Sequence, residues 1–208
     1  MVLCAYRERK EMDYSLYNEK RYRRRYQAYR CILGLQQMFF HPVLFLIWIP
    51  FSVGVGFYIT GIRIVTNNVS VYPLFITAFR WSMKLITILF PIICAVAMLQ
   101  LIGHVAAVKD ESNLSIVFAE RREIRCQPPI LVYKRVKKNG VIQREFDTII
   151  PLEYWRKKQE EISDRFNIRL ITDITYGGRN RNKGYRIYFE AVKGRKPKES
   201  GVLYDDTL

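Results

Sequence analysis

Two uncharged stretches decide the fold: residues 42–62 read PVLFLIWIPFSVGVGFYITGI and residues 85–108 read LITILFPIICAVAMLQLIGHVAAV. No Lys, Arg, Asp or Glu occurs in either stretch, and the first uncharged run already begins at Cys31. A helix that crosses a bilayer core of about 30 Å needs roughly 20 apolar residues. Each stretch is long enough, so the sequence predicts a hairpin of two transmembrane helices within residues 42–108.

Composition supports this separation of charge from apolar residues. The chain has 208 residues, of which 50% are hydrophobic and 25% charged, and its net charge is +15. A single soluble globule or a disordered basic protein would not sort its residues in this way. The first stretch is too long, and too far from the N-terminus, for a cleaved signal peptide. The residues after Val108 suffice for one modest domain.

The distribution of basic residues predicts the topology. Residues 1–41 contain 9 Lys and Arg against 4 acidic residues, and residues 109–208 contain 22 against 15. The segment 63–84 contains only 3 basic residues and no acidic one. The positive-inside rule concerns short segments beside the spans, and by that rule both termini are expected in the cytoplasm. We therefore expect a multi-pass protein of the cytoplasmic membrane with a short outer loop.

A basic run, KRYRRRY at residues 20–26, precedes the first span. Juxtamembrane clusters of Lys and Arg bind anionic lipid headgroups. Because Tyr22 and Tyr26 interleave the arginines, contact with nucleic acid is the alternative. The position beside the membrane favours lipid. The predicted membrane-surface residues are Lys20, Arg21, Arg23, Arg24 and Arg25.

The segment after the second span predicts a connector and a small α+β domain. Residues 109–129 are polar and end at a Pro-Pro pair that interrupts any helix. The Asn-Gly pair at 139–140 is typical of a β-hairpin turn. Apolar periodicity in residues 130–196 then predicts the order β-β-α-β-β, with strands at 130–136, 141–150, 168–176 and 185–192 and a helix at 152–167.

The sequence contains no recognisable catalytic motif. We find no convergent set of nucleophile, base or metal ligands, so we expect no enzyme activity, no cofactor and no metal site. The loop GGRNRNKG at 177–184 is not a P-loop, because Lys183 precedes Gly184 and no Ser or Thr follows. The four cysteines have no paired spacing, which indicates reduced thiols rather than disulfides or a zinc site.

Basic residues gather in the two expected hairpins of the domain. If both hairpins lie at one end of the sheet, they form a track for a phosphate backbone without sequence specificity. The alternative is that cytoplasmic turns beside an anionic membrane are commonly basic. The predicted nucleic-acid-binding residues are Lys134, Arg135, Lys137, Lys138, Arg179, Arg181 and Lys183.

The segments NIRLITDITYGG (167–178), GYRIYFEAVKG (184–194) and SGVLYDDTL (200–208), following two spans, resemble a known family. They are similar to the N-terminal membrane and pre-motor region of FtsK/SpoIIIE-type DNA translocases. Within this group they most resemble the coupling proteins of conjugative plasmids and integrative elements of Gram-positive bacteria.

The resemblance implies a membrane anchor that supports homo-oligomers, often hexamers, and a pre-motor collar that guides DNA. It also implies that residues 197–208 are a linker toward an ATPase core beyond Leu208, and that partners include other DNA-transfer proteins. We therefore expect an anchoring and DNA-guiding segment without the motor. The alternative is a standalone membrane-tethered protein-interaction module that does not bind DNA.

Overall fold

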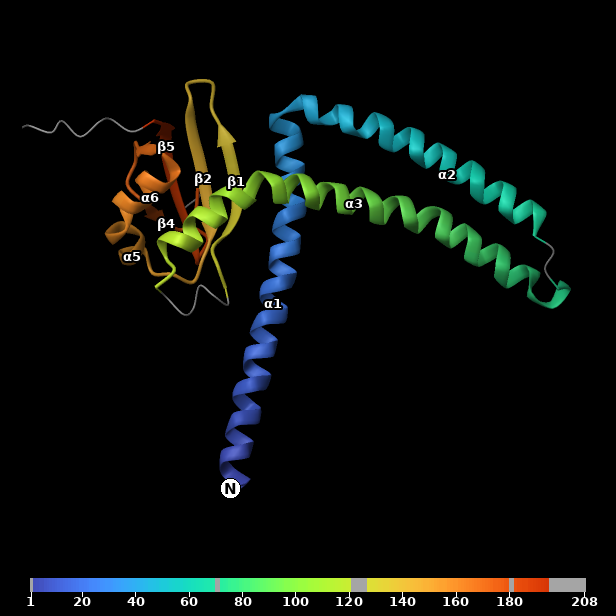
Figure 1. The fold of residues 1–208 in the computed structure, drawn as a ribbon, viewed down its shortest axis with the longest axis horizontal. Coiled ribbons are helices and arrows are strands. Elements are labelled where there is room, and N and C mark those ends of the chain that lie inside the picture. Colours follow the sequence, from blue (N-terminus) through green and yellow to red (C-terminus); the bar gives the residue numbers. More distant parts are fainter. Residues whose placement is uncertain (1, 70–71, 121–126, 180–181, 195–208) are drawn as a thin grey trace, which may run out of the picture. The chain divides into compact units, whose positions relative to one another are not determined.

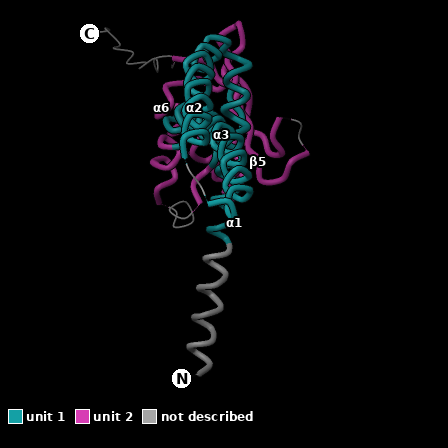
Figure 2. Tube along the Cα trace, turned by 90° about the vertical axis from the view of Figure 1, so that its right-hand side faces the viewer, with its two compact units in different colours: residues 1–111, 130–134 teal, residues 112–129, 135–208 magenta. Residues whose placement is uncertain are grey.

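The computed structural model describes residues 2–69, 72–120, 127–179 and 182–194, and side chains from Asn18 onward (Figure 1). The chain forms two compact units, which Figure 2 distinguishes by colour. Unit 1 comprises residues 1–111 and 130–134, and unit 2 comprises residues 112–129 and 135–208. Each unit is described by itself. The expected linker at 197–208 lies outside the described residues.

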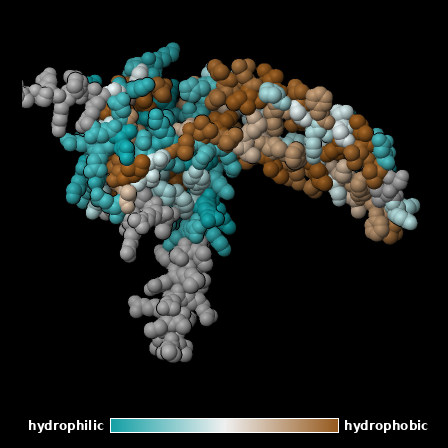
Figure 3. All heavy atoms as spheres, viewed as in Figure 1, coloured by the Kyte–Doolittle hydropathy of each residue, from teal (hydrophilic) through white to brown (hydrophobic). Residues whose placement is uncertain are grey.

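Unit 1 is built from helices. The segments Pro42–Asn68 and Pro73–Val117 are long and apolar enough to cross a membrane, and in Figure 3 hydrophobic residues gather over both. The helices are α1 (Val2–Phe40), the short 3-10 helix η1 (Pro42–Ile47), α2 (Trp48–Asn68), the 3-10 helix η2 (Pro73–Phe75) and α3 (Ile76–Val117).

Two helices include residues beyond the predicted transmembrane stretches. The basic tail forms α1, a helix of 39 residues, and α3 runs through the first part of the expected connector to Val117. In α1, buried residues recur at helical spacing and form a packing face. This face is hard to recognise in the sequence because many residues of α1 are charged. They are Arg30, Leu33, Gly34, Gln37 and Met38. In α3, Leu114 and Val117 are buried in the same way.

An antiparallel sheet dominates unit 2, and residues 130–134 of its strand β1 are counted with unit 1. The strand order is β1-β2-β5-β3, and β4 also pairs with β5. The strands are β1 (Ile130–Val136), β2 (Val141–Asp147), β3 (Ile168–Leu170), β4 (Thr175–Tyr176) and β5 (Arg186–Lys193), with α5 (Leu152–Lys157) and α6 (Gln159–Phe166) between β2 and β3.

Three predicted elements of unit 2 differ from the structure. The strand expected at 168–176 is two strands, β3 and β4, separated at 171–174, and both pair with β5. The single helix expected at 152–167 divides at Lys158, and the strand expected at 141–150 ends at Asp147. Asn167 ends α6 in the left-handed conformation, as predicted for the end of the helix.

Aromatic rings form the centre of the core of unit 2. Trp155 of α5 is fully buried, with its ring 5.0 Å from that of Phe118 and 5.7 Å from that of Phe146. The ring of Phe189 stacks on Phe146 at 5.9 Å. Because Phe146 and Phe189 belong to adjacent strands, the α5 helix covers the apolar face of the sheet at β2 and β5.

Candidate membrane anchor and nucleic-acid interface

The Tyr58 side chain of α2 contacts α3. The hydroxyl of Tyr58 donates a hydrogen bond to the carbonyl of Ile86 at 3.1 Å, and its ring stacks on Phe90 at 4.7 Å. In hydrocarbon, a polar hydroxyl requires such a partner. The contact therefore satisfies the one polar atom of Tyr58 within an apolar pair of helices.

Helices α1 and α3 of unit 1 approach each other closely at two glycines. A Cβ atom on Gly34 would lie 2.0 Å from the carbonyl oxygen of Leu99, and one on Gly103 would lie 2.0 Å from that of Arg30. Any side chain at either position would collide with backbone. Small residues permit such crossings in membrane proteins. This crossing is not predictable from local sequence pattern, because the two glycines lie 69 positions apart.

Two ion pairs involve residues near the crossing. Arg30 pairs with Glu111, and Lys134 pairs with Asp110 at 3.0 Å. The other oxygen of Glu111 accepts a hydrogen bond from the backbone N–H of Leu131. Lys134, expected to contact nucleic acid, is therefore engaged within unit 1.

The basic run of α1 lies against the second apolar stretch through helix packing. Arg23 and Tyr26 line a common cavity with Ala97, Leu101 and His104 of α3. The run lies beside the C-terminal part of the stretch 85–108 because α1 and α3 cross at the two glycines, although the two segments are far apart in the sequence. Of the predicted membrane-surface residues, Lys20, Arg21, Arg23 and Arg24 are exposed and Arg25 is half-buried.

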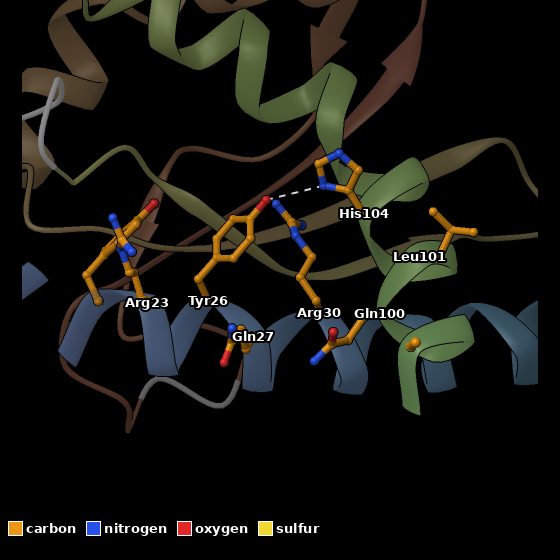
Figure 4. A pocket seen from close by; sticks show the side chains of 9 residues that line it. Arg23, Tyr26, Gln27, Arg30, Gln100, Leu101 and His104 are labelled. Atoms are coloured by element: carbon orange, nitrogen blue, oxygen red, sulfur yellow. Dashed lines mark hydrogen bonds between the residues drawn. The ribbon is translucent and has the colours of Figure 1, made fainter. Parts of the chain in front are cut away.

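The cavity between α1 and α3 has a volume of about 500 Å³. In Figure 4 the guanidinium of Arg30 lies beside the hydroxyl of Tyr26 and the ring of His104. The Tyr26 hydroxyl and His104 Nδ1 are 3.3 Å apart and hydrogen-bonded. The guanidinium carbon of Arg30 lies 4.3 Å from the centre of the Tyr26 ring, a cation–π contact. The lining residues are Tyr22, Arg23, Tyr26, Gln27, Arg30, Ala97, Gln100, Leu101 and His104.

A polar network lies on β2 and β5 of the sheet, centred on Glu190. The Glu190 carboxylate accepts hydrogen bonds from the Tyr188 hydroxyl at 2.5 Å, the Gln143 amide at 2.7 Å and the Lys137 ammonium at 3.2 Å. These bonds, the one from Tyr188 first, hold the pKa of Glu190 below its ordinary value. Lys137 is therefore partly neutralised by its own sheet.

The two basic hairpins lie at opposite ends of the sheet, which contradicts the expectation of one end. In the antiparallel register, Val141 after the first hairpin is opposite Val192, whereas Asp147 at the other end of β2 is opposite Arg186. Six residues of strand separate these ends by about 20 Å. The expected track at one end of the sheet is absent because the hairpins precede β2 and β5, and these two strands are antiparallel.

The first end of the sheet carries Lys138 and Lys193, both exposed, beside Lys137. Lys193 joins this end because it is opposite Ile168, the first residue of β3, and next to Val192. Arg135 is exposed on β1. Lys193 is not among the predicted nucleic-acid-binding residues, and only the strand register places it with the first hairpin.

The second end consists of β4, the following loop and the start of β5. Glu145 is buried and pairs with Arg186 at 2.6 Å. A Cβ atom on Gly178, whose φ is +71°, would lie 2.6 Å from the Glu145 carboxylate. Glu145 thus packs directly beneath the start of the loop, which carries the exposed Arg179 and Lys183. Arg181 lies outside the described residues.

Two tyrosines at the second end of the sheet are exposed. Tyr176 is 49% exposed and Tyr185 is 65% exposed. The backbone N–H of Tyr185 donates to the Tyr176 hydroxyl at 2.9 Å, and Tyr185 has a φ of +63° that removes it from β5. Exposed aromatic rings beside cations are the elements of a platform for single-stranded nucleic acid.

Metal-ligating residues do not cluster in the part of the chain that the structure describes: no group of three or more His, Cys, Asp or Glu is present there. Of the cysteines whose side chains are described, Cys31 and Cys94 are free thiols.

Comparison with known proteins gives a limited result. No protein-family model and no curated protein matches the chain. Among solved structures, the chain is similar to the monomer form of the pCW3 conjugation coupling protein TcpA with ATPgS, at 19% identity and a TM-score of 0.35. The match covers 43% of this chain and 25% of that chain.

Proposed function

We propose that this chain anchors a DNA-transfer protein of the FtsK/SpoIIIE type at the cytoplasmic membrane and contacts DNA through its α+β domain without reading its sequence. Helices α2 and α3 form the anchor, with both termini in the cytoplasm. The chain itself carries out no catalysis. It assembles as a homo-oligomer and works with other proteins of conjugative transfer, as its resemblance to coupling proteins implies.

Two features support the anchoring part of the proposal. The apolar segments Pro42–Asn68 and Pro73–Val117 expose large hydrophobic side chains along their length, which is costly in water and favourable in lipid. Basic residues are concentrated in the segments that would lie in the cytoplasm, beginning with the run 20–26.

The observation that carries the nucleic-acid part is the second end of the sheet. There the exposed rings of Tyr176 and Tyr185 accompany the cations Arg179 and Lys183. Aromatic rings stack on unpaired bases of any sequence, and cations bind the phosphates. This arrangement favours single-stranded DNA over duplex DNA, since bases in a duplex are already stacked.

The test is a salt titration of DNA binding by the full chain in detergent. Fluorescence anisotropy with labelled oligothymidylate should give an affinity that falls steeply as salt rises. The double variant R179E/K183E should reduce the slope of log affinity against log salt by about 2 × 0.7, the single-strand value per phosphate contact. The matched variant K138E/K193E makes the same charge change at the opposite end and should have the smaller effect.

Two outcomes would overturn the nucleic-acid part. If the chain binds no DNA at low salt, the domain is a protein-interaction module. If both double variants weaken binding equally, net charge rather than the second end governs binding.

A further inference from the structure

The cavity between α1 and α3 contains a buried cation with unused donors. Arg30 is 2% exposed, and its Nη2 is engaged by Glu111. Its Nε and Nη1 atoms are buried and have no hydrogen-bond acceptor among the described residues. A buried donor without an acceptor is destabilising, and more so when the group is charged. These two N–H groups can therefore donate hydrogen bonds to the oxygen atoms of a ligand.

The polar lining of the cavity selects for an anion. Beside Arg30 it presents Arg23, the Gln27 amide, the Tyr26 hydroxyl and the His104 ring, and no carboxylate lines it. The Glu19 carboxylate that pairs with Arg23 at 2.6 Å is outside the lining. Guanidinium groups bind phosphate oxygens through pairs of parallel N–H bonds.

The apolar residues that line the cavity favour a ligand with an apolar part. Ala97 and Leu101 belong to the uncharged stretch 85–108 of α3, and Leu101 is 63% exposed. Nearby Val105, one turn further along α3, is 67% exposed. A ligand whose phosphate reaches Arg30 can therefore continue along an apolar helix face. The volume of about 500 Å³ suits a headgroup of small-molecule size.

We propose that this cavity binds the phosphodiester headgroup of an anionic phospholipid, with Arg30 and Gln27 holding the phosphate and Leu101 contacting an acyl chain. The site differs from general attraction of the basic run to a membrane surface, because it is a defined cavity with a stoichiometry of one. The inference rests on the anchoring part of the proposed function and is independent of DNA contact.

The test uses the full chain in detergent, titrated with a short-chain phosphatidylglycerol and followed by native mass spectrometry. One lipid should bind per chain. Gln27→Glu places a carboxylate in the cavity while keeping the Arg30–Glu111 pair, and it should weaken binding about tenfold, or 1.4 kcal/mol. Ala28→Glu adds the same charge at the next position of α1, outside the lining, and should leave binding within twofold of wild type.

Probes of related chemistry separate the possible sources of the phosphate. Phosphatidylcholine of the same chain length should bind more weakly, because its cationic choline opposes the arginines. Inorganic phosphate and oligothymidylate should not displace the lipid. The proposal is overturned if no lipid binds at a stoichiometry of one, if Ala28→Glu weakens binding as much as Gln27→Glu, or if phosphatidylcholine, phosphate or DNA competes equally. Membrane insertion, measured separately by alkaline extraction, would persist under each of these outcomes if only this inference fails.

Discussion

Gly34 and Gly103 lie where α1 and α3 cross so closely that a Cβ on either would fall 2.0 Å from a carbonyl oxygen of the opposite helix. This crossing brings the basic tail helix to the end of the second apolar stretch. It also aligns Arg30 with Glu111. The contact therefore joins the charged and the apolar parts of unit 1.

Replacing Gly103 with alanine should destabilise unit 1. The added methyl group meets backbone that can only move by separating the helices, which should cost about 1–3 kcal/mol. Thermal unfolding of the detergent-solubilised chain, followed by circular dichroism, measures the loss. Gly61→Ala is the matched control, because a Cβ there meets nothing within 4 Å and alanine favours helix. Equal stability of the two variants would contradict the crossing.

Glu145 should support the second end of the sheet. Glu145→Ala leaves Arg186 without its 2.6 Å partner and removes the group packed beneath Gly178, so we expect a loss of about 3–5 kcal/mol. Urea unfolding followed by tryptophan fluorescence gives the value. Glu153→Ala, at an exposed position of α5, should change stability by less than 0.5 kcal/mol. A loss of the same size in both variants would show that the Arg186 pair is not responsible.

Acid should weaken unit 2 through Glu190. Its pKa in the folded chain lies below the ordinary value of 4.5, because the Tyr188 hydroxyl and the Gln143 amide donate to the carboxylate. The stabilisation is therefore complete above about pH 4.5 and is lost as the pH falls through the folded pKa. In urea unfolding between pH 7 and pH 3, Glu190→Gln should reduce this loss. A variant with the full pH dependence of the wild type would exclude Glu190 as its source.

Tyr185 should contribute to DNA binding without contributing to stability. Its φ of +63° is a conformation that glycine adopts freely, so Tyr185→Gly should change the unfolding free energy by less than 1 kcal/mol. Loss of one stacked base should weaken binding of oligothymidylate by 1–3 kcal/mol, about 5- to 150-fold. Tyr154→Ala, which removes another exposed ring on α5, should leave the affinity unchanged. Unchanged affinity in Tyr185→Gly would remove this ring from the interface.

The local features of the fold follow from the sequence, because they depend on neighbouring residues. The two apolar stretches, the Asn-Gly turn before Val141 and the end of the helix at Asn167 are of this kind. The strand expected at 185–192 begins at Arg186, because the positive φ of Tyr185 cannot be recognised from periodicity.

The long-range features do not follow from periodicity. Nothing in the local pattern indicates that Gly34 meets Gly103, or that the register between β2 and β5 sends the two basic hairpins to opposite ends. Lys134 resembles the other hairpin cations in sequence, but its pairing with Asp110 engages it within unit 1. Candidate sites made from residues far apart in the chain therefore required the structure.

The most direct test of an anchor that carries a DNA-contacting domain is co-flotation. The full chain is reconstituted in vesicles, mixed with labelled oligothymidylate and centrifuged through a density gradient. We predict that DNA floats with the vesicles at low salt, that high salt releases the DNA while the protein still floats, and that R179E/K183E floats without retaining DNA. Protein that leaves the vesicles on alkaline washing, or DNA that stays at the bottom at low salt, would contradict the account.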